Sequence, residues 1–278
     1  MRIPFIRPAD LSPEQRSLYD DMKTGIEEHF KGFKAISDDG ELMGPWNPMI
    51  HTPSIGGPVW DLIKSMVSDL KSIETAVNVF QDSYRGFPGD LSNAPNLIPG
   101  CVTGVYCSSG DGNLKVASDG TDQYTWRSPV VGTNPQAGES IQFWKHLALL
   151  DLFGGIDISA NPATPRFGAS HLASRIGSGG FEFYYDALTT IFPQGTHILR
   201  LSSESVLSGS AALGVLTPLQ AEKIDNIMDD GEPNSGSVVA NYGTLADTCK
   251  DGTAAGAPSS YKVTTTSADC IMFFRLLK

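Results

Sequence analysis

The sequence predicts an α+β fold, in which a short helical cap precedes a long amino-terminal helix that leads into a head with a small antiparallel sheet. Apolar residues recur every three or four positions from Pro58 to about Tyr84, which is the period of one amphipathic helix. Short strand-like runs separated by turn residues follow in the second half of the chain. Helices that come before a group of hairpin-like strands are typical of the α+β class.

The composition limits the possible partners. The chain has 278 residues and a formal net charge of −11, so it can bury a sizeable core but lacks the cationic surface that nucleic acids and anionic membranes attract. No apolar run approaches the roughly 20 residues that cross a bilayer. Residues 1–8 carry charge at both ends and lack an apolar core of signal-peptide length, so the sequence shows no leader.

The first helix is expected to begin after Ser12. Ser12 can cap the helix, Pro13 suits its first position, and Gln15 completes a capping box. Apolar residues then recur every four positions to about Lys31. The proline-rich stretch at 44–53 is expected to be a connector that cannot stay helical for long.

The long helix has one apolar stripe, which is expected to form its packing face. Asp61, Lys64 and other polar residues fall mainly off this stripe, and the glycine- and proline-rich stretch after Arg85 ends the helix. The stripe consists of Trp60, Ile63, Val67, Leu70, Ile73, Val77, Phe80 and Tyr84.

Two further helices and four strands are expected in the head. Residues 138–155 have an amphipathic pattern, and another helix starts at Thr217, with Gln220 as its capping partner, and ends at Gly231. The strand-like runs lie at 181–185, 196–201, 237–240 and 271–276.

The four cysteines are spaced as two local pairs. Cys101 and Cys107 lie in a short glycine-rich stretch, whereas Cys249 and Cys270 bracket the carboxyl-terminal region. An even count with this spacing fits two disulfides, although three pairings are possible in principle and four unrelated buried thiols are the alternative. Cysteines spaced in this way are typical of extracellular proteins.

Residues 2–66 contain the strings RIPFIRPADLSPEQRSLYDDM and GPWNPMIHTP. These strings resemble the amino-terminal part of carboxymuconolactone decarboxylase-like proteins, the family that includes alkylhydroperoxidase D. In that family a Cys-x-x-Cys pair or a Glu/His arrangement further along the chain acts on a peroxide or lactone. Here Cys101 and Cys107 have five residues between them, so the resemblance implies a helical cap without the catalytic part.

The string DLKSIETAVNVFQDSYRGFPGDLSNA at 69–94 resembles the segment after the membrane helix in type IV pilin-like and type II secretion pseudopilin-like proteins. The similarity continues through GESIQFWKHLALLDLFGG, LTPLQAEKIDNIMDDGEPNSGSVVA and ADCIMFFRLL, and covers about 69–278. In that family a prepilin leader and an apolar membrane helix precede this point. The cap segment stands in their place, so the chain resembles a fusion, either natural or engineered.

The two resemblances divide the chain into a cap segment at 1–66, a long connecting helix at 58–85 and a pilin-like head at 86–278. The pilin-like resemblance implies a non-enzymatic subunit of a type IV pilus or type II secretion system, in an extracellular, cell-surface or periplasmic location. Such a subunit would pack with other pilin-like subunits, associate with itself through the long helix, or recognise a surface. A divergent decarboxylase-like or alkylhydroperoxidase-like enzyme and an adhesin-like binding module are the alternatives.

No catalytic constellation emerges from the sequence, and calcium is the one cofactor that it suggests. The histidines lack His-x-x-x-His spacing, and no Gly-x-Ser-x-Gly elbow is present. Two carboxylate-rich loops are candidates for an irregular calcium site, with solvated acidic turns as the alternative. The first loop contains Asp111, Asp119 and Asp122, and the second contains Asp229, Asp230 and Glu232.

Overall fold

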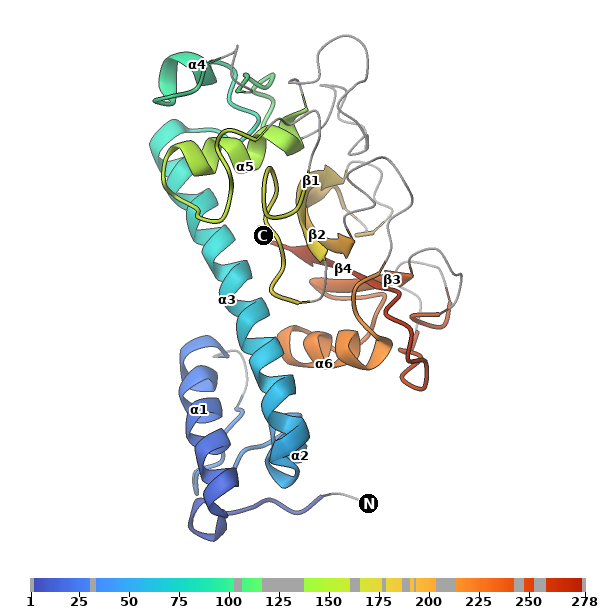
Figure 1. Cartoon of the computed structure of the whole chain (residues 1–278). Helices are drawn as coiled ribbons and strands as arrows, with labels where there is room; N and C mark the ends of the chain where they lie inside the picture. Colours follow the sequence, from blue (N-terminus) through green and yellow to red (C-terminus); the bar gives the residue numbers. More distant parts are fainter. Residues whose placement is uncertain are drawn as a thin grey trace.

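The computed structural model describes residues 3–30, 34–102, 107–116, 138–160, 166–176, 179–186, 191–192, 194–203, 214–242, 248–252 and 259–276. Its elements confirm the α+β class, since helices pack around a four-stranded antiparallel sheet (Figure 1). The helices are η1 (Pro8–Asp10), α1 (Pro13–His29), α2 (Trp46–His51), α3 (Pro53–Tyr84), α4 (Ala94–Leu97), α5 (Glu139–Leu149) and α6 (Pro218–Met228). The strands are β1 (Gly179–Asp186), β2 (Thr196–Ser203), β3 (Val238–Tyr242) and β4 (Cys270–Arg275).

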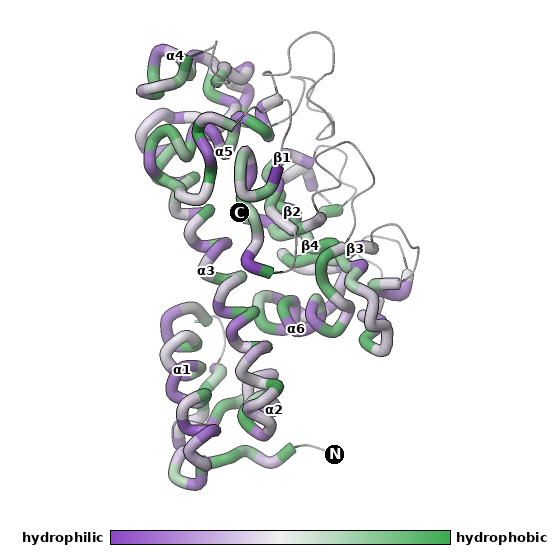
Figure 2. The backbone as a smooth tube through the Cα atoms, in the orientation of Figure 1, coloured by the Kyte–Doolittle hydropathy of each residue, from purple (hydrophilic) through white to green (hydrophobic). Residues whose placement is uncertain are grey.

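Helix α3 connects the two ends of the molecule, with α1 and α2 beside its amino-terminal half and α5 and the sheet beside its carboxyl-terminal half (Figure 1). It begins at Pro53 and not at the predicted Pro58, and it has 32 residues. Pro58 is tolerated because it removes only the hydrogen bond to the Ser54 carbonyl, close to the helix start and beside solvent. Hydrophobic and hydrophilic residues are interspersed along the whole of α3 (Figure 2).

The predicted packing face of α3 is buried within the chain itself. Tyr84 is partly buried, and its ring lies 4.8 Å from that of Phe80. The other members of the stripe are at most 5% exposed: Trp60, Ile63, Val67, Leu70, Ile73, Val77 and Phe80.

In the cap, the capping box at the start of α1 is confirmed. The Gln15 N–H donates to Ser12 Oγ (3.3 Å), and the Ser12 N–H donates to Gln15 Oε1 (3.0 Å). The connector predicted at 44–53 contains the short helix α2, whose six residues agree with the expectation that this stretch does not stay helical for long. Pro48 lies in the first turn of α2, where its missing N–H would have no helical partner.

The head contains all four predicted strands, in the spatial order β1-β2-β4-β3 with every pair antiparallel. Alternation of side chains sends Phe183, Leu199 and Phe274 to the same face, where they join the main core with α3 and α5. The predicted helix at 138–155 is shorter in the structure, since α5 ends at Leu149 and Asp151 has a left-handed φ of 56°.

Two large hydrophobic clusters meet along α3. The main core lies between α3, α5 and the sheet, whereas the cap cluster contains Trp46 and Trp60 among others. Ile227, near the end of α6, belongs to the cap cluster, so a helix of the head also covers the core of the cap. Within the part of the chain that the structure describes, no helix has both the length and the apolar character needed to cross a membrane.

Candidate functional site

Both disulfides that the cysteine spacing favours are present. Cys101 bonds to Cys107, and Cys249 bonds to Cys270. All four cysteines are buried in the main core. Two disulfides suggest an oxidising environment, of the extracellular or periplasmic kind.

The turn after α3 contains a fully buried aspartate, Asp90. Its carboxylate accepts the backbone N–H groups of Gly112 (2.8 Å), Asn113 (3.1 Å) and Leu114 (2.8 Å). Leu114 has a left-handed φ of 66°, which is uncommon for a leucine, and the bond to Asp90 stabilises this conformation. Asp90 therefore fixes the shape of the loop at 107–116.

Helix α5 holds the same loop from its own side. Glu139 Oε1 accepts the Asp111 N–H (2.9 Å), and Gln142 Oε1 accepts the Ser108 N–H (3.3 Å). Glu139 and Gln142 are three residues apart and so lie on one face of α5. The buried polar side chains on this face thus bind backbone groups of the loop.

His146, one turn further along α5, links the loop to the turn after α3. Its Nδ1 accepts the Gly89 N–H (2.9 Å), so its Nε2 carries the proton and donates to the Ser108 carbonyl (3.0 Å). Gly89 has a φ of 88°, and a Cβ there would lie 2.2 Å from the Glu139 carbonyl oxygen. Only glycine permits this approach.

The electrostatics of this site are those of a buried structural network. Oxygens of Asp90, Asp111 and Glu139 lie within 4.8 Å of one another. Burial raises the pKa of Asp90 to about 6, against the opposing effect of the loop N–H groups, and nearby Asp111 raises it further. Burial lowers the pKa of His146 to about 4, so the imidazole is neutral at neutral pH.

Of the three residues in the first predicted calcium site, the structure describes only Asp111. Asp119 and Asp122 lie outside the described residues. The structure brings Asp111 to Asp90 and Glu139, which are distant in sequence and which the sequence did not indicate. Because Asp90 and Glu139 already accept backbone N–H groups, a calcium site at this point stays a prediction.

The second carboxylate cluster lies at the end of α6. It brings Asp229 and Asp230 together with Asp225, with oxygens within 4.8 Å of one another, and it does not include the predicted Glu232 side chain. Asp229 accepts the Val238 N–H (3.0 Å), and Asp230 accepts the Glu232 N–H (2.9 Å). These bonds shape the turn between α6 and β3.

Asp225 is the fully buried member of this cluster. It accepts the Tyr261 hydroxyl (2.7 Å) and the Gly231 N–H (3.3 Å). Burial raises the pKa of Asp225 to about 8, so the carboxyl is mostly protonated at neutral pH. Its position one helical turn before Asp229 could have indicated that it belongs to the cluster, although not that it is buried.

Calcium at this cluster also stays a prediction. Calcium prefers several anionic or carbonyl oxygens, and three aspartates supply such oxygens. A cation would have to displace the proton of Asp225 and compete with the loop donors on Asp229 and Asp230.

Two clefts flank the middle of α3. The larger has a volume of about 630 Å³ and lies between α3, the end of α6 and the ends of β3 and β4, with Leu70, Met228 and Phe274 among its apolar residues and Lys71 and Glu74 among its polar ones. Its described lining contains no histidine, cysteine or aspartate. The smaller cleft lies on the side of Asp151 and shares Lys71.

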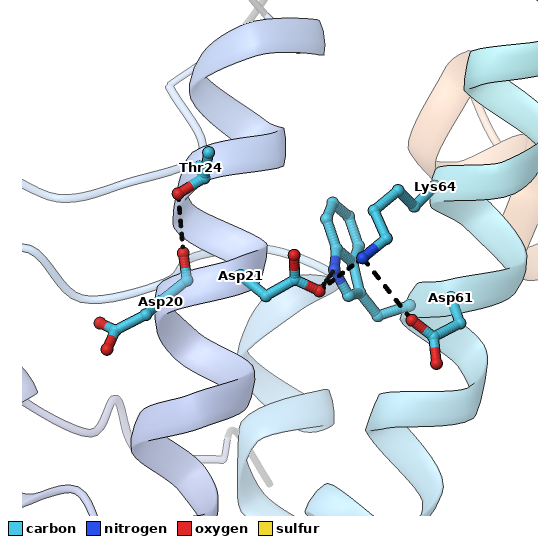
Figure 3. Close-up of polar contacts among 6 residues, drawn as sticks. Asp20, Asp21, Thr24, Asp61 and Lys64 are labelled. Atoms are coloured by element: carbon cyan, nitrogen blue, oxygen red, sulfur yellow. Dashed lines mark hydrogen bonds and ion pairs between the residues drawn. The ribbon is translucent and has the colours of Figure 1, made fainter.

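The cap is fastened to α3 by a polar contact as well as by its core. Asp21 of α1 accepts hydrogen bonds from Trp60 Nε1 (2.8 Å) and Lys64 Nζ (2.7 Å). Figure 3 shows the contact between Asp21 and Lys64. Lys64 also lies 3.7 Å from Asp61. The hydrogen bond from Lys64 lowers the pKa of Asp21, and the same bond raises the pKa of Lys64.

Comparisons of the chain with protein-family models, curated proteins and solved structures give no match.

Proposed function

We propose that the chain is a non-enzymatic, pilin-like or pseudopilin-like subunit that acts through contacts of its surface. The observation that carries the proposal is the 32-residue helix α3, which leads from the cap into a disulfide-containing head with a four-stranded antiparallel sheet. The resemblance of residues 69–278 to pilin-like proteins supports filament packing or surface recognition as its role, outside the cytoplasm.

The arrangement of polar groups supports a non-enzymatic role. The buried groups Asp90, Glu139 and His146 bind backbone atoms of neighbouring loops, which is a structural use of their charge and hydrogen bonds. The described lining of the larger cleft beside α3 is largely apolar, with Leu70, Met228 and Phe274 among its residues, and includes neither a histidine nor a cysteine.

The surface available for contact with another subunit is the outward side of α3. The apolar stripe from Trp60 to Phe80 is already buried within the chain. The opposite side exposes Lys71, Thr75 and Val79, and the two clefts run along it. We place the contact between subunits on this side.

The test is sedimentation velocity of the whole chain over a range of concentrations, with Val79→Asp as the variant. Val79 is 43% exposed, so an aspartate is accommodated in the monomer. In a contact, the carboxylate would be buried without a partner, so we expect association to weaken roughly tenfold or more, since about 1.4 kcal/mol is tenfold.

Val263→Asp is the matched control, because Val263 is 40% exposed and lies in the carboxyl-terminal part of the head. It should leave association unchanged. A chain that stays monomeric at every concentration, or two variants with equal effects, would refute self-association through α3.

Thiol–disulfide chemistry at Cys101–Cys107 is a second candidate function. A ring nitrogen of His146 and the two sulfurs lie within 4.8 Å of one another. The burial of all three side chains and the two hydrogen bonds of His146 favour a structural role instead. A hydroperoxide-reduction assay with thiol, compared with Cys101→Ser and Cys107→Ser, should show no cysteine-dependent turnover if our first proposal holds.

A further inference from the structure

A buried lysine and a buried asparagine meet in the carboxyl-terminal part of the head. Lys250 and Asn234 are each only 4% exposed, and Lys250 Nζ donates a hydrogen bond to Asn234 Oδ1. Lysine is almost never fully buried without a charged partner. This pair places a primary amine directly against a side-chain amide.

The pair lies beside the main core of the head. Lys250 follows the disulfide-bonded Cys249 and pairs with Tyr261 in an antiparallel bridge. Cys249 and Tyr261 both belong to the main core. Asn234 lies in the turn between α6 and β3, and the Ala240 N–H donates to the carbonyl of the preceding residue, Pro233 (2.9 Å).

The amine is suited to act as a nucleophile. Burial lowers the pKa of Lys250 to about 8, so a substantial fraction of the amine is neutral near pH 8 and carries a free electron pair. The hydrogen bond to Oδ1 holds Nζ beside the amide whose carbon it would attack, and this fixed placement replaces a bimolecular encounter.

We propose that Lys250 and Asn234 form an intramolecular isopeptide bond. Nζ of the neutral lysine attacks Cγ of Asn234, and the Cγ–Nδ2 bond breaks. The proton lost by Nζ ends on the leaving nitrogen, which departs as ammonia. No oxidant, reductant or other reactant takes part, and the product is an uncharged amide in place of an amine and an amide.

The bond would close the segment 234–250, which contains β3, next to the disulfide between Cys249 and Cys270. The isopeptide bond would then join the turn after α6 covalently to the bridge between Lys250 and Tyr261. This inference does not depend on the proposed pilin-like role, because it rests on the chemistry of the pair alone.

The test is the intact mass of the whole chain without reductant. We expect a mass about 17 Da below that calculated for the chain with two disulfides, which corresponds to one ammonia. After reduction, tryptic cleavage should fail after Lys250 and still occur after Lys262. A wild-type mass at the calculated value, or normal cleavage after Lys250, would overturn the proposal.

Variants identify the atoms involved. Lys250→Met and Asn234→Ala should both have their calculated masses, whereas Lys262→Met, which changes the lysine next to Tyr261, should keep the deficit of about 17 Da. A deficit that persists in Lys250→Met would show that the ammonia comes from cyclisation at an asparagine without the lysine, and would also overturn the proposal. The wild-type measurement decides the question even if a variant fails to fold.

Discussion

Gly56, in the first turns of α3, lies against the backbone of α2. A Cβ at this position would be 2.1 Å from the Met49 carbonyl oxygen, whereas a Cβ at the neighbouring Gly57 would meet no atom within 4 Å. Both residues are helical, so their conformational costs are similar. The two glycines therefore separate the effect of close packing from the effect of helix propensity.

We expect Gly56→Ala and Gly57→Ala to change stability in opposite directions. Gly57→Ala should raise the free energy of unfolding by roughly 0.4–1 kcal/mol, because alanine favours the helix. Gly56→Ala should lower it by about 1–3 kcal/mol, because backbone must move apart to admit the methyl group. Chemical denaturation of both variants measures the difference, and equal effects would contradict the close approach of α2 and α3.

At the residue scale, the sequence predicts best what depends on near neighbours. The capping boxes at Ser12 and Thr217 involve residues three positions apart, and both are confirmed. Asp90 and Asp225 could not be recognised as buried, because their burial depends on loops and strands that approach only in the folded chain. An isolated aspartate in a sequence ordinarily indicates a solvated surface.

At the scale of elements, the two disulfides close loops of different length. The sequence separations are 6 for Cys101–Cys107 and 21 for Cys249–Cys270. Loop-closure entropy then predicts stabilisation of about 2.4 kcal/mol for the shorter loop and about 3.4 kcal/mol for the longer one. The disulfide that closes the longer loop should therefore contribute more to the free energy of unfolding, although all four sulfurs are buried in the same core.

Paired alanine substitutions measure this order. Replacing Cys249 and Cys270 should lower the free energy of unfolding by about 1 kcal/mol more than replacing Cys101 and Cys107. Because each pair removes two buried sulfurs, the loss of packing is matched. A larger loss from the shorter loop would show that the disulfide at Cys101 stabilises the loop at 107–116 in the folded state.

At the scale of elements, type is more predictable than extent. All four strands follow from short β-branched and aromatic runs, whereas α3 begins earlier than predicted because a proline inside its first turns costs little there. The short helix α2 was not predicted as a separate element, because a proline usually interrupts a helix. Pro48 is tolerated because it lies in the first turn of α2.

For the whole molecule, the division into cap and head is less sharp in the packing than in the sequence. The sequence suggests a boundary near residue 66, where two resemblances meet. In the structure, Ile227 of α6 completes the cap cluster, and Asp21 of α1 binds Trp60 and Lys64 of α3. Periodicity in one helix cannot reveal such contacts, because they depend on which surfaces meet.

Global stability should depend on pH through Asp225. The pKa of this carboxyl is about 8 in the folded protein and 3.8 in its ordinary state, because burial disfavours the charged form. Between these values the folded state binds more protons than the unfolded state, so stability falls as pH rises, by about 1.4 kcal/mol per pH unit. The contribution is present at low pH and is lost as the pH rises to about 8.

Between pH 6.5 and 8 the buried histidines oppose this effect, so Asp225 has to be isolated by comparison with a variant. Burial lowers the pKa of His146 to about 4 and of His171 and His197 to about 3, so all three are neutral in the folded state throughout this window. In the unfolded state, with an ordinary pKa of 6.5, they are half protonated at pH 6.5 and neutral at pH 8. They therefore raise stability as the pH rises, because the unfolded state binds the additional protons.

Denaturant unfolding in EDTA at pH 6.5, 7 and 8 should therefore show that the free energy of unfolding of the wild type, relative to that of Asp225→Asn, falls by about 1.6 kcal/mol across the window. Asp225→Asn cannot titrate at residue 225, so its own pH profile contains only the contributions of the other groups, whatever its absolute stability. The difference between the two proteins cancels every other group with the same pKa in both. Parallel pH profiles for the wild type and Asp225→Asn would mean that Asp225 is ionised in the folded state and that its burial is offset by a bound cation or by solvent.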